Sequence, residues 1–121
     1  MLTLRVDTTL SCAHKLVDCV GVSSQCRRLH GHTYYVEVYI ESQTCNLVVD
    51  ADIVKDVIDD AFDHRYLNDR FEELGIKGET TLENLAKGIW DLVQEACYAN
   101  ADVVEVVVQE GDGAAVRLNG E

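Results

Sequence analysis

Residues 30–40 read His-Gly-His-Thr-Tyr-Tyr-Val-Glu-Val-Tyr-Ile, and this run decides the fold. Apolar and polar side chains alternate through most of it, which predicts a half-buried β-strand. Side chains two positions apart in a strand point to the same face, so His30 and His32 share the buried face with Tyr34. The strand therefore presents two imidazoles side by side at its beginning.

A second strand is predicted over residues 2–14. Its apolar positions alternate with polar ones and are Leu2, Leu4, Val6 and Leu10. The same alternation, continued without a bulge, brings Cys12 and His14 onto the buried face. Three of the four histidines then meet at the adjoining ends of two strands, and three neutral imidazoles with an open fourth position suit a catalytic zinc ion, Zn²⁺. The alternative is a set of core histidines with ordinary hydrogen-bond partners.

The rest of the chain predicts two helices and a closing hairpin. Asp50 can cap a helix with apolar residues at helical spacing from Ile53 to Phe62, and Thr80-Thr81-Leu82-Glu83 fits a capping box before a second helix that runs to about Ala96. A β-branched run over residues 103–109, a Gly-Asp-Gly turn at 111–113 and a last run over 114–119 predict the hairpin. The order β-β-α-α-β-β indicates an α+β fold, with two helices on one face of a four-stranded antiparallel sheet.

Length and composition restrict the class of protein. The 121 residues contain no linker or shift in composition, which predicts a single domain over residues 1–121. The first ten residues alternate instead of forming a signal peptide, and no run is long enough to cross a membrane, so we expect a cytoplasmic protein with reduced cysteines. Acidic residues outnumber basic ones 22 to 10, and the net charge of −12 argues against nucleic acid as a partner.

The sheet face away from the helices predicts self-association. It mixes charged and larger uncharged side chains, namely Arg5, Tyr35, Glu37, Tyr39, Glu105, Val107 and Arg117. A lone sheet would also have free edges, which invite pairing with another chain. Closing several sheets edge to edge into a barrel would pair those edges and leave this face lining a wet interior, so we expect a cyclic homo-oligomer.

Cys26 is a candidate catalytic thiol. It stands four residues before His30, and Arg27 and Arg28 lie between them. A neighbouring metal ion and the two guanidinium groups would favour the thiolate, which is the reactive form. The alternative is a buried cysteine that only packs.

Two acidic positions complete the set of candidate residues. Asp63 and His64 follow each other where the first helix should end. A carboxylate can orient an imidazole for proton transfer, although a histidine at a helix C-terminus is also favoured by the helix dipole alone. Glu110 ends a strand on its buried side and can grip a guanidine-like group through two hydrogen bonds, or it can be one more exposed acid.

Six motifs carry a resemblance to a known family. They are Ser11-Cys12-Ala13-His14, Cys26-x3-His30-Gly31-His32, Val49-Asp50, Asp63-His64-x2-Leu67-Asn68, Thr81-x-Glu83-Asn84 and Glu110. With them the chain resembles the 6-pyruvoyltetrahydropterin synthase and 6-carboxytetrahydropterin synthase family nearly from end to end. The family often has proline before the position of Thr81, where this chain has Thr80.

The resemblance implies a tunnelling fold (T-fold) that assembles into a homohexamer of two trimers, with active sites at subunit interfaces. It also implies a role for each candidate residue: zinc ligation by His14, His30 and His32, acid-base catalysis by Cys26, a proton relay by Asp63 and His64 that a neighbouring subunit can supply, and substrate binding by Glu110 and Thr81.

The three-residue gap between Cys26 and His30 resembles the bacterial 6-carboxytetrahydropterin synthases of the queuosine (7-deazaguanine) pathway. The implied lyase reaction converts 7,8-dihydroneopterin triphosphate to 6-carboxy-5,6,7,8-tetrahydropterin, acetaldehyde and triphosphate. Two alternatives keep the fold and change the product: a 6-pyruvoyltetrahydropterin synthase and an aldolase-like enzyme of folate synthesis. An alternative of another class is a zinc- or pterin-binding module without turnover.

Overall fold

The computed structural model describes residues 1–17, 21, 23–43, 46–97 and 101–120. The elements are β1 (Leu2–His14), the 3-10 turn η1 (Ser24–Arg27), β2 (His30–Ser42), α1 (Ala51–Phe62), β3 (Arg65–Tyr66), α2 (Leu67–Leu74), α3 (Leu82–Ala96), β4 (Ala101–Glu110) and β5 (Ala114–Asn119). Cys12, Cys26 and Cys97 are free thiols, as expected, whereas Cys19 and Cys45 lie outside the described residues.

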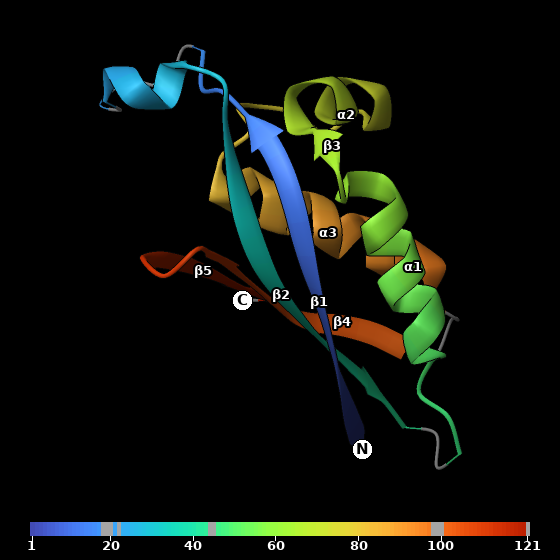
Figure 1. The fold of residues 1–121 in the computed structure, drawn as a ribbon. Coiled ribbons are helices and arrows are strands. Elements are labelled where there is room, and N and C mark those ends of the chain that lie inside the picture. Colours follow the sequence, from blue (N-terminus) through green and yellow to red (C-terminus); the bar gives the residue numbers. More distant parts are fainter. Residues whose placement is uncertain (18–20, 22, 44–45, 98–100, 121) are drawn as a thin grey trace.

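One sheet runs through the molecule in the order β3-β1-β2-β4-β5 (Figure 1). The predicted antiparallel pairs are confirmed, and β1 pairs with β2 without a bulge, so His14 lies opposite His30. The prediction of a four-stranded, purely antiparallel sheet is wrong, because β3 adds a fifth strand parallel to β1, with Arg65 opposite Cys12. A two-residue strand is too short to show an alternating pattern.

A third helix, α2, follows β3 directly and was not predicted. Leu67 and Phe71 are its buried residues, and Gly75 ends it in the left-handed conformation at φ 72°. The helix has eight residues, and its N-cap Tyr66 makes no side-chain capping bond, so the usual start signal is missing.

The predicted starts of the two long helices differ in accuracy. The Asp50 carboxylate accepts a hydrogen bond from the Asp52 amide at 2.9 Å, which confirms the predicted cap of α1. The capping box before α3 is wrong by one residue, since Thr81 is the N-cap and its hydroxyl accepts from the Asn84 amide at 3.2 Å. Thr80 does not cap the helix. Its side chain is buried, and its hydroxyl contacts Lys15 and Asn68 instead.

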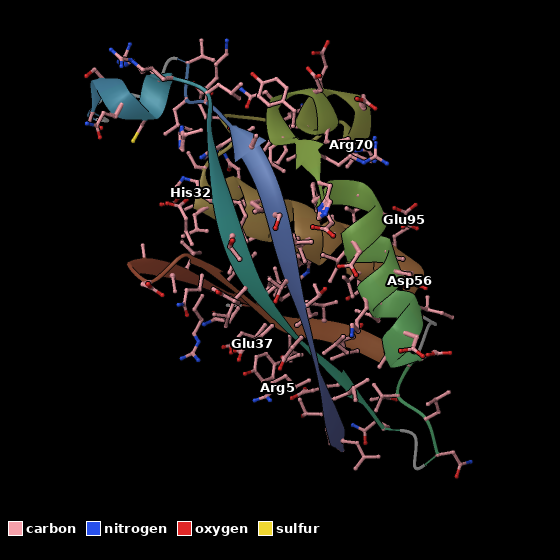
Figure 2. The ribbon with its side chains drawn as sticks, viewed as in Figure 1. Arg5, His32, Glu37, Asp56, Arg70 and Glu95 are labelled. Carbon is pink, nitrogen blue, oxygen red and sulfur yellow. The ribbon has the colours of Figure 1, made fainter. Side chains whose placement is uncertain are left out.

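The helices and the sheet form two layers, with α1 and α3 packed on one face of the sheet (Figure 1). The buried side chains between them are mainly Val, Leu, Ile and Phe. Arg5 and Glu37 lie over the lower half of β1 and β2 in Figure 2, whereas His32 lies near the upper end of β2. Among the described residues, no helix has the length and apolar character needed to span a membrane.

Candidate active site

The ends of β1 and β2 bring three histidines together. His14 is the last residue of β1, and His30 and His32 are the first and third residues of β2. Their ring centroids are 4.5 to 5.1 Å apart, and their possible ligand atoms all lie within 4.8 Å of one another. The convergence expected from the alternating pattern is therefore present in the fold.

Two of these rings have their tautomer fixed by backbone carbonyls. His14 Nδ1 lies 2.7 Å from the Thr80 carbonyl oxygen, and His30 Nδ1 lies 2.6 Å from that of Arg28. A carbonyl oxygen only accepts hydrogen bonds, so in the neutral form of each ring Nδ1 carries the proton and Nε2 keeps its lone pair. This is the arrangement that second-shell carbonyls impose on metal-binding histidines.

His14 Nε2 is the buried polar side-chain atom without a hydrogen-bond partner in the described residues. Such an unsatisfied atom normally destabilises a fold by about 1–3 kcal/mol, and its presence calls for an explanation. Burial lowers the pKa of His14, the charges of His30 and His32 add to this effect, and the Thr80 bond and Glu110 oppose it. The ring is thus held in its neutral, metal-binding form, and the donor set fits a zinc ion.

Glu110 and Thr81 line a hollow next to the buried histidine. The hollow has a volume of about 420 Å³, and its walls include His14, Leu82 and β5 residues. Glu110 Oε1 also lies 3.6 Å from His32 Nε2, beyond a good hydrogen bond. The predicted ring anchor and one predicted metal ligand, His14, therefore border one cavity.

Asp63 and His64 form a pair held against β1. The Asp63 carboxylate lies 3.2 Å from His64 Nδ1 and accepts a 2.8 Å hydrogen bond from the Ser11 amide. The His64 amide in turn donates to the Ser11 carbonyl at 2.7 Å. His64 has φ 59°, a conformation that is uncommon for residues other than glycine and that occurs preferentially at functional sites.

The His64 side chain is 77% exposed, and it does not line the hollow that contains Glu110. It lines a second, shallower hollow of about 550 Å³ together with His32, Arg65 and Tyr66. Within one described chain, the proposed relay and the proposed ring anchor therefore line different hollows.

Cys26 lies in η1, the turn that links the two histidine-bearing strands. Its backbone carbonyl accepts from the Leu16 amide at 2.9 Å, which ties η1 to the end of β1. The Ser23 hydroxyl lies 3.4 Å from the half-buried sulfur. Cys26 is not part of the three-histidine ligand group in the described residues, so the fold places it beside the strands but does not join it to the cluster.

Sequence reasoning missed three partners of the histidines. Tyr34 is edge-on to His14 and His32, with ring centroids 6.4 and 5.8 Å away, and only its face had been predicted. The carbonyls of Thr80 and Arg28 were not foreseen, because backbone acceptors leave no signal in residue identity. Burial and the Glu110 charge both raise the pKa of Tyr34, which therefore stays neutral.

Comparison with protein families identifies the class of protein to which this sheet, its helical layer and the three-histidine cluster belong. The model of the family described as 6-pyruvoyl tetrahydropterin synthase matches residues 3–121, and the chain belongs to this family. A curated 6-carboxy-5,6,7,8-tetrahydropterin synthase from Synechocystis is 33% identical over 106 residues, which cover 78% of this chain and 77% of the relative. The resemblance seen in the motifs is confirmed.

Solved structures show the same fold. The 6-pyruvoyl tetrahydropterin synthase of Caenorhabditis elegans has a TM-score of 0.75 at 21% identity, covering 99% of this chain and 96% of that one. The Wolinella succinogenes protein WS1659 has a TM-score of 0.71 at 17% identity, with both chains fully covered. At these identities the likeness supports the architecture alone.

Proposed function

We propose that the chain is a zinc-dependent 6-carboxytetrahydropterin synthase that acts on 7,8-dihydroneopterin triphosphate in the route to queuosine. The observation that carries the proposal is the unpartnered Nε2 of buried His14, which lies in a cluster of three imidazoles beside a hollow lined by Glu110. The 33% identity to a curated 6-carboxytetrahydropterin synthase favours this product over the alternatives.

His14, His30 and His32 would hold the zinc ion, with a fourth position left for substrate. When bound, zinc stabilises negative charge that develops on substrate oxygens. The Thr80 and Arg28 carbonyls keep the rings of His14 and His30 in the tautomer that this ligation needs.

Glu110 orients the pterin ring in this proposal. Its carboxylate can accept two parallel hydrogen bonds from the guanidine-like part of the ring. Thr81 lies on the same hollow, and its hydroxyl oxygen already accepts from the Asn84 amide. The Thr81 hydroxyl proton remains available to donate to the substrate.

Cys26 and the Asp63–His64 pair transfer protons at the substrate carbons and hydroxyls. Asp63 holds His64 Nδ1, which leaves Nε2 to take up or release a proton. Since His64 and Glu110 line different hollows of one chain, we infer that a neighbouring copy supplies the relay within a homohexamer of two trimers.

The decisive experiment is product analysis. Zinc-loaded protein is incubated with 7,8-dihydroneopterin triphosphate, and the products are identified by mass spectrometry. We expect 6-carboxytetrahydropterin and acetaldehyde. A pyruvoyl or hydroxymethyl product would move the chain to another branch, and no conversion in the presence of zinc would support a binding module instead.

A pair of cysteine variants tests the proposed thiol. Cys26→Ala should lower turnover by about 10²–10⁴-fold, because it removes a group that transfers protons. Zinc and pterin should still bind, because the substitution removes no metal ligand. Cys97→Ala is the matched control, since Cys97 is also a half-buried thiol and caps the far end of α3. Equal turnover of the two variants would remove Cys26 from the mechanism.

Shared sites can be tested by mixing two inactive variants. Cys26→Ala and His64→Ala subunits are unfolded together and refolded into mixed oligomers. If each site takes Cys26 and His64 from different copies, the mixture regains part of the activity that each variant lacks. No recovery, in mixtures that mass measurement shows to contain both subunits, would contradict the shared site.

A further inference from the structure

The side-chain amide of Asn68 acts as an additional strand residue beside β1. Its Oδ1 accepts a hydrogen bond from the Lys15 amide at 3.1 Å, and its Nδ2 donates to the Lys15 carbonyl at 2.9 Å. The backbone pairing of β3 with β1 stops two residues earlier, where Tyr66 lies opposite Ala13. Asn68 therefore extends that pairing past His14 and fixes the chain directly after this proposed ligand.

Thr80 connects this amide to the histidine. Its hydroxyl lies 3.3 Å from both Asn68 Oδ1 and the Lys15 carbonyl, and its side chain is buried, with 3% of the residue exposed. Its own carbonyl accepts the hydrogen bond from His14 Nδ1. A continuous series of contacts thus runs from Asn68 through Thr80 to the ring of His14.

We propose that Asn68 and Thr80 are positioning residues that hold the Thr80 carbonyl in place and thereby set the ring orientation and tautomer of His14 before a metal binds. The proposal rests on the zinc site of the proposed function. A ligand that is already oriented loses less conformational freedom when the ion binds, so the loss of its outer partners lowers metal affinity.

Gln94 offers a matched control within the same chain. Its Oε1 accepts from the Val103 amide at 2.8 Å, and its Nε2 donates to the Ala101 carbonyl at 3.1 Å. These are the same two kinds of bond that Asn68 makes to a strand end. Ala101 pairs with Ser42, so Gln94 acts at the opposite end of β2 from His30.

Zinc affinity is measured by competition with a chromophoric chelator for the wild type, Asn68→Ala and Gln94→Ala. Both variants should lose stability, because each loses one bond to a backbone amide and one to a backbone carbonyl, and Asn68→Ala also loses the contact with the Thr80 hydroxyl. We expect about tenfold weaker zinc binding by Asn68→Ala and wild-type affinity for Gln94→Ala. Wild-type affinity in Asn68→Ala, or an equal loss in both variants, would overturn the positioning role.

Thr80 is tested by two substitutions, of which valine keeps its volume and serine keeps its hydroxyl. Thr80→Val removes the hydroxyl and should weaken zinc binding, whereas Thr80→Ser keeps the hydroxyl and should restore most of the affinity. Equal affinities of the two variants would contradict a role for the hydroxyl bonds.

A readout without metal separates this inference from the proposed function. Nitrogen-15 NMR of the zinc-free protein should show His14 protonated at Nδ1 in the wild type and a mixture of tautomers in Asn68→Ala. A single tautomer in both proteins would overturn the positioning role even if zinc binds. A wild type that holds the tautomer but binds no zinc would instead overturn the proposed metal site.

Discussion

The two ends of β1 and β2 use the same sheet face for different purposes. At one end, which we call the aliphatic end, Val6 lies opposite Val38 and Leu4 lies opposite Ile40. At the other, the histidine end, His14 lies opposite His30, and its own buried Nε2 has no hydrogen-bond partner among the described residues. Both ends follow the same alternation of buried and exposed residues, so the periodic pattern alone does not distinguish them.

The difference shows which end of the two strands stabilises the fold. At the aliphatic end, the buried side chains of Val6, Val38 and Ile40 belong to the hydrophobic core and pack carbon against carbon, which is the arrangement that stabilises a core. The histidine end holds an unsatisfied imidazole nitrogen, and the neighbouring turn holds His64 in a left-handed conformation. Both features destabilise an apo protein, and both are expected where binding and catalysis set the requirements.

The largest effect on stability should come from the aliphatic end. Ile40 is fully buried between Leu4 of β1 and Val103 of β4, and Ile40→Ala should lower the free energy of unfolding by about 3 kcal/mol through lost burial and a residual cavity. Denaturant unfolding of the metal-free protein measures this loss. Zinc affinity should stay at the wild-type value, because Ile40 is eight residues along the strand from His32.

Ile40→Val is the graded control for this substitution. It removes one methylene and should lower the free energy of unfolding by about 1 kcal/mol. Zinc affinity could instead fall in both variants, in proportion to the stability that each one loses. The two ends would then be coupled, and the comparison would fail.

Zinc binding should change the free energy of unfolding by a slightly smaller amount, and it should distinguish variants of the two ends. At a free zinc concentration of about 100 times its dissociation constant, the wild type should gain about 2.7 kcal/mol of stability, because zinc binds the folded state. His14→Ala should gain little at the same concentration, since one of three ligands is missing. Ile40→Ala should gain as much as the wild type, and unfolding with and without zinc measures all three proteins.

The parts of the site that could be predicted from the sequence are those governed by a local period. Alternation over β1 and β2, with an unbulged register, was enough to bring His14 to His30. β3 and α2 were missed because two strand residues and eight helical residues carry too little pattern. The contact of His14 with Thr80 depends on a connection 66 residues later in the chain folding back onto β1, and no local rule contains that information.

The smallest effect concerns the strained turn at the histidine end. His64→Ala and His64→Gly both remove the imidazole, and both should lose the proposed proton relay and most of the turnover. They differ in the backbone, because alanine keeps the cost of φ 59° and glycine does not. His64→Gly should therefore be more stable than His64→Ala by about 1 kcal/mol.

Thermal unfolding of the two inactive variants measures this difference directly. A gain in stability with a loss of turnover would show that the turn is kept for catalysis at the expense of stability, unlike anything expected at the aliphatic end. If the alanine variant is at least as stable as the glycine variant, the Ser11 and Asp63 hydrogen bonds already compensate for the strain. The two ends would then differ in chemistry alone and not in how much stability each gives up.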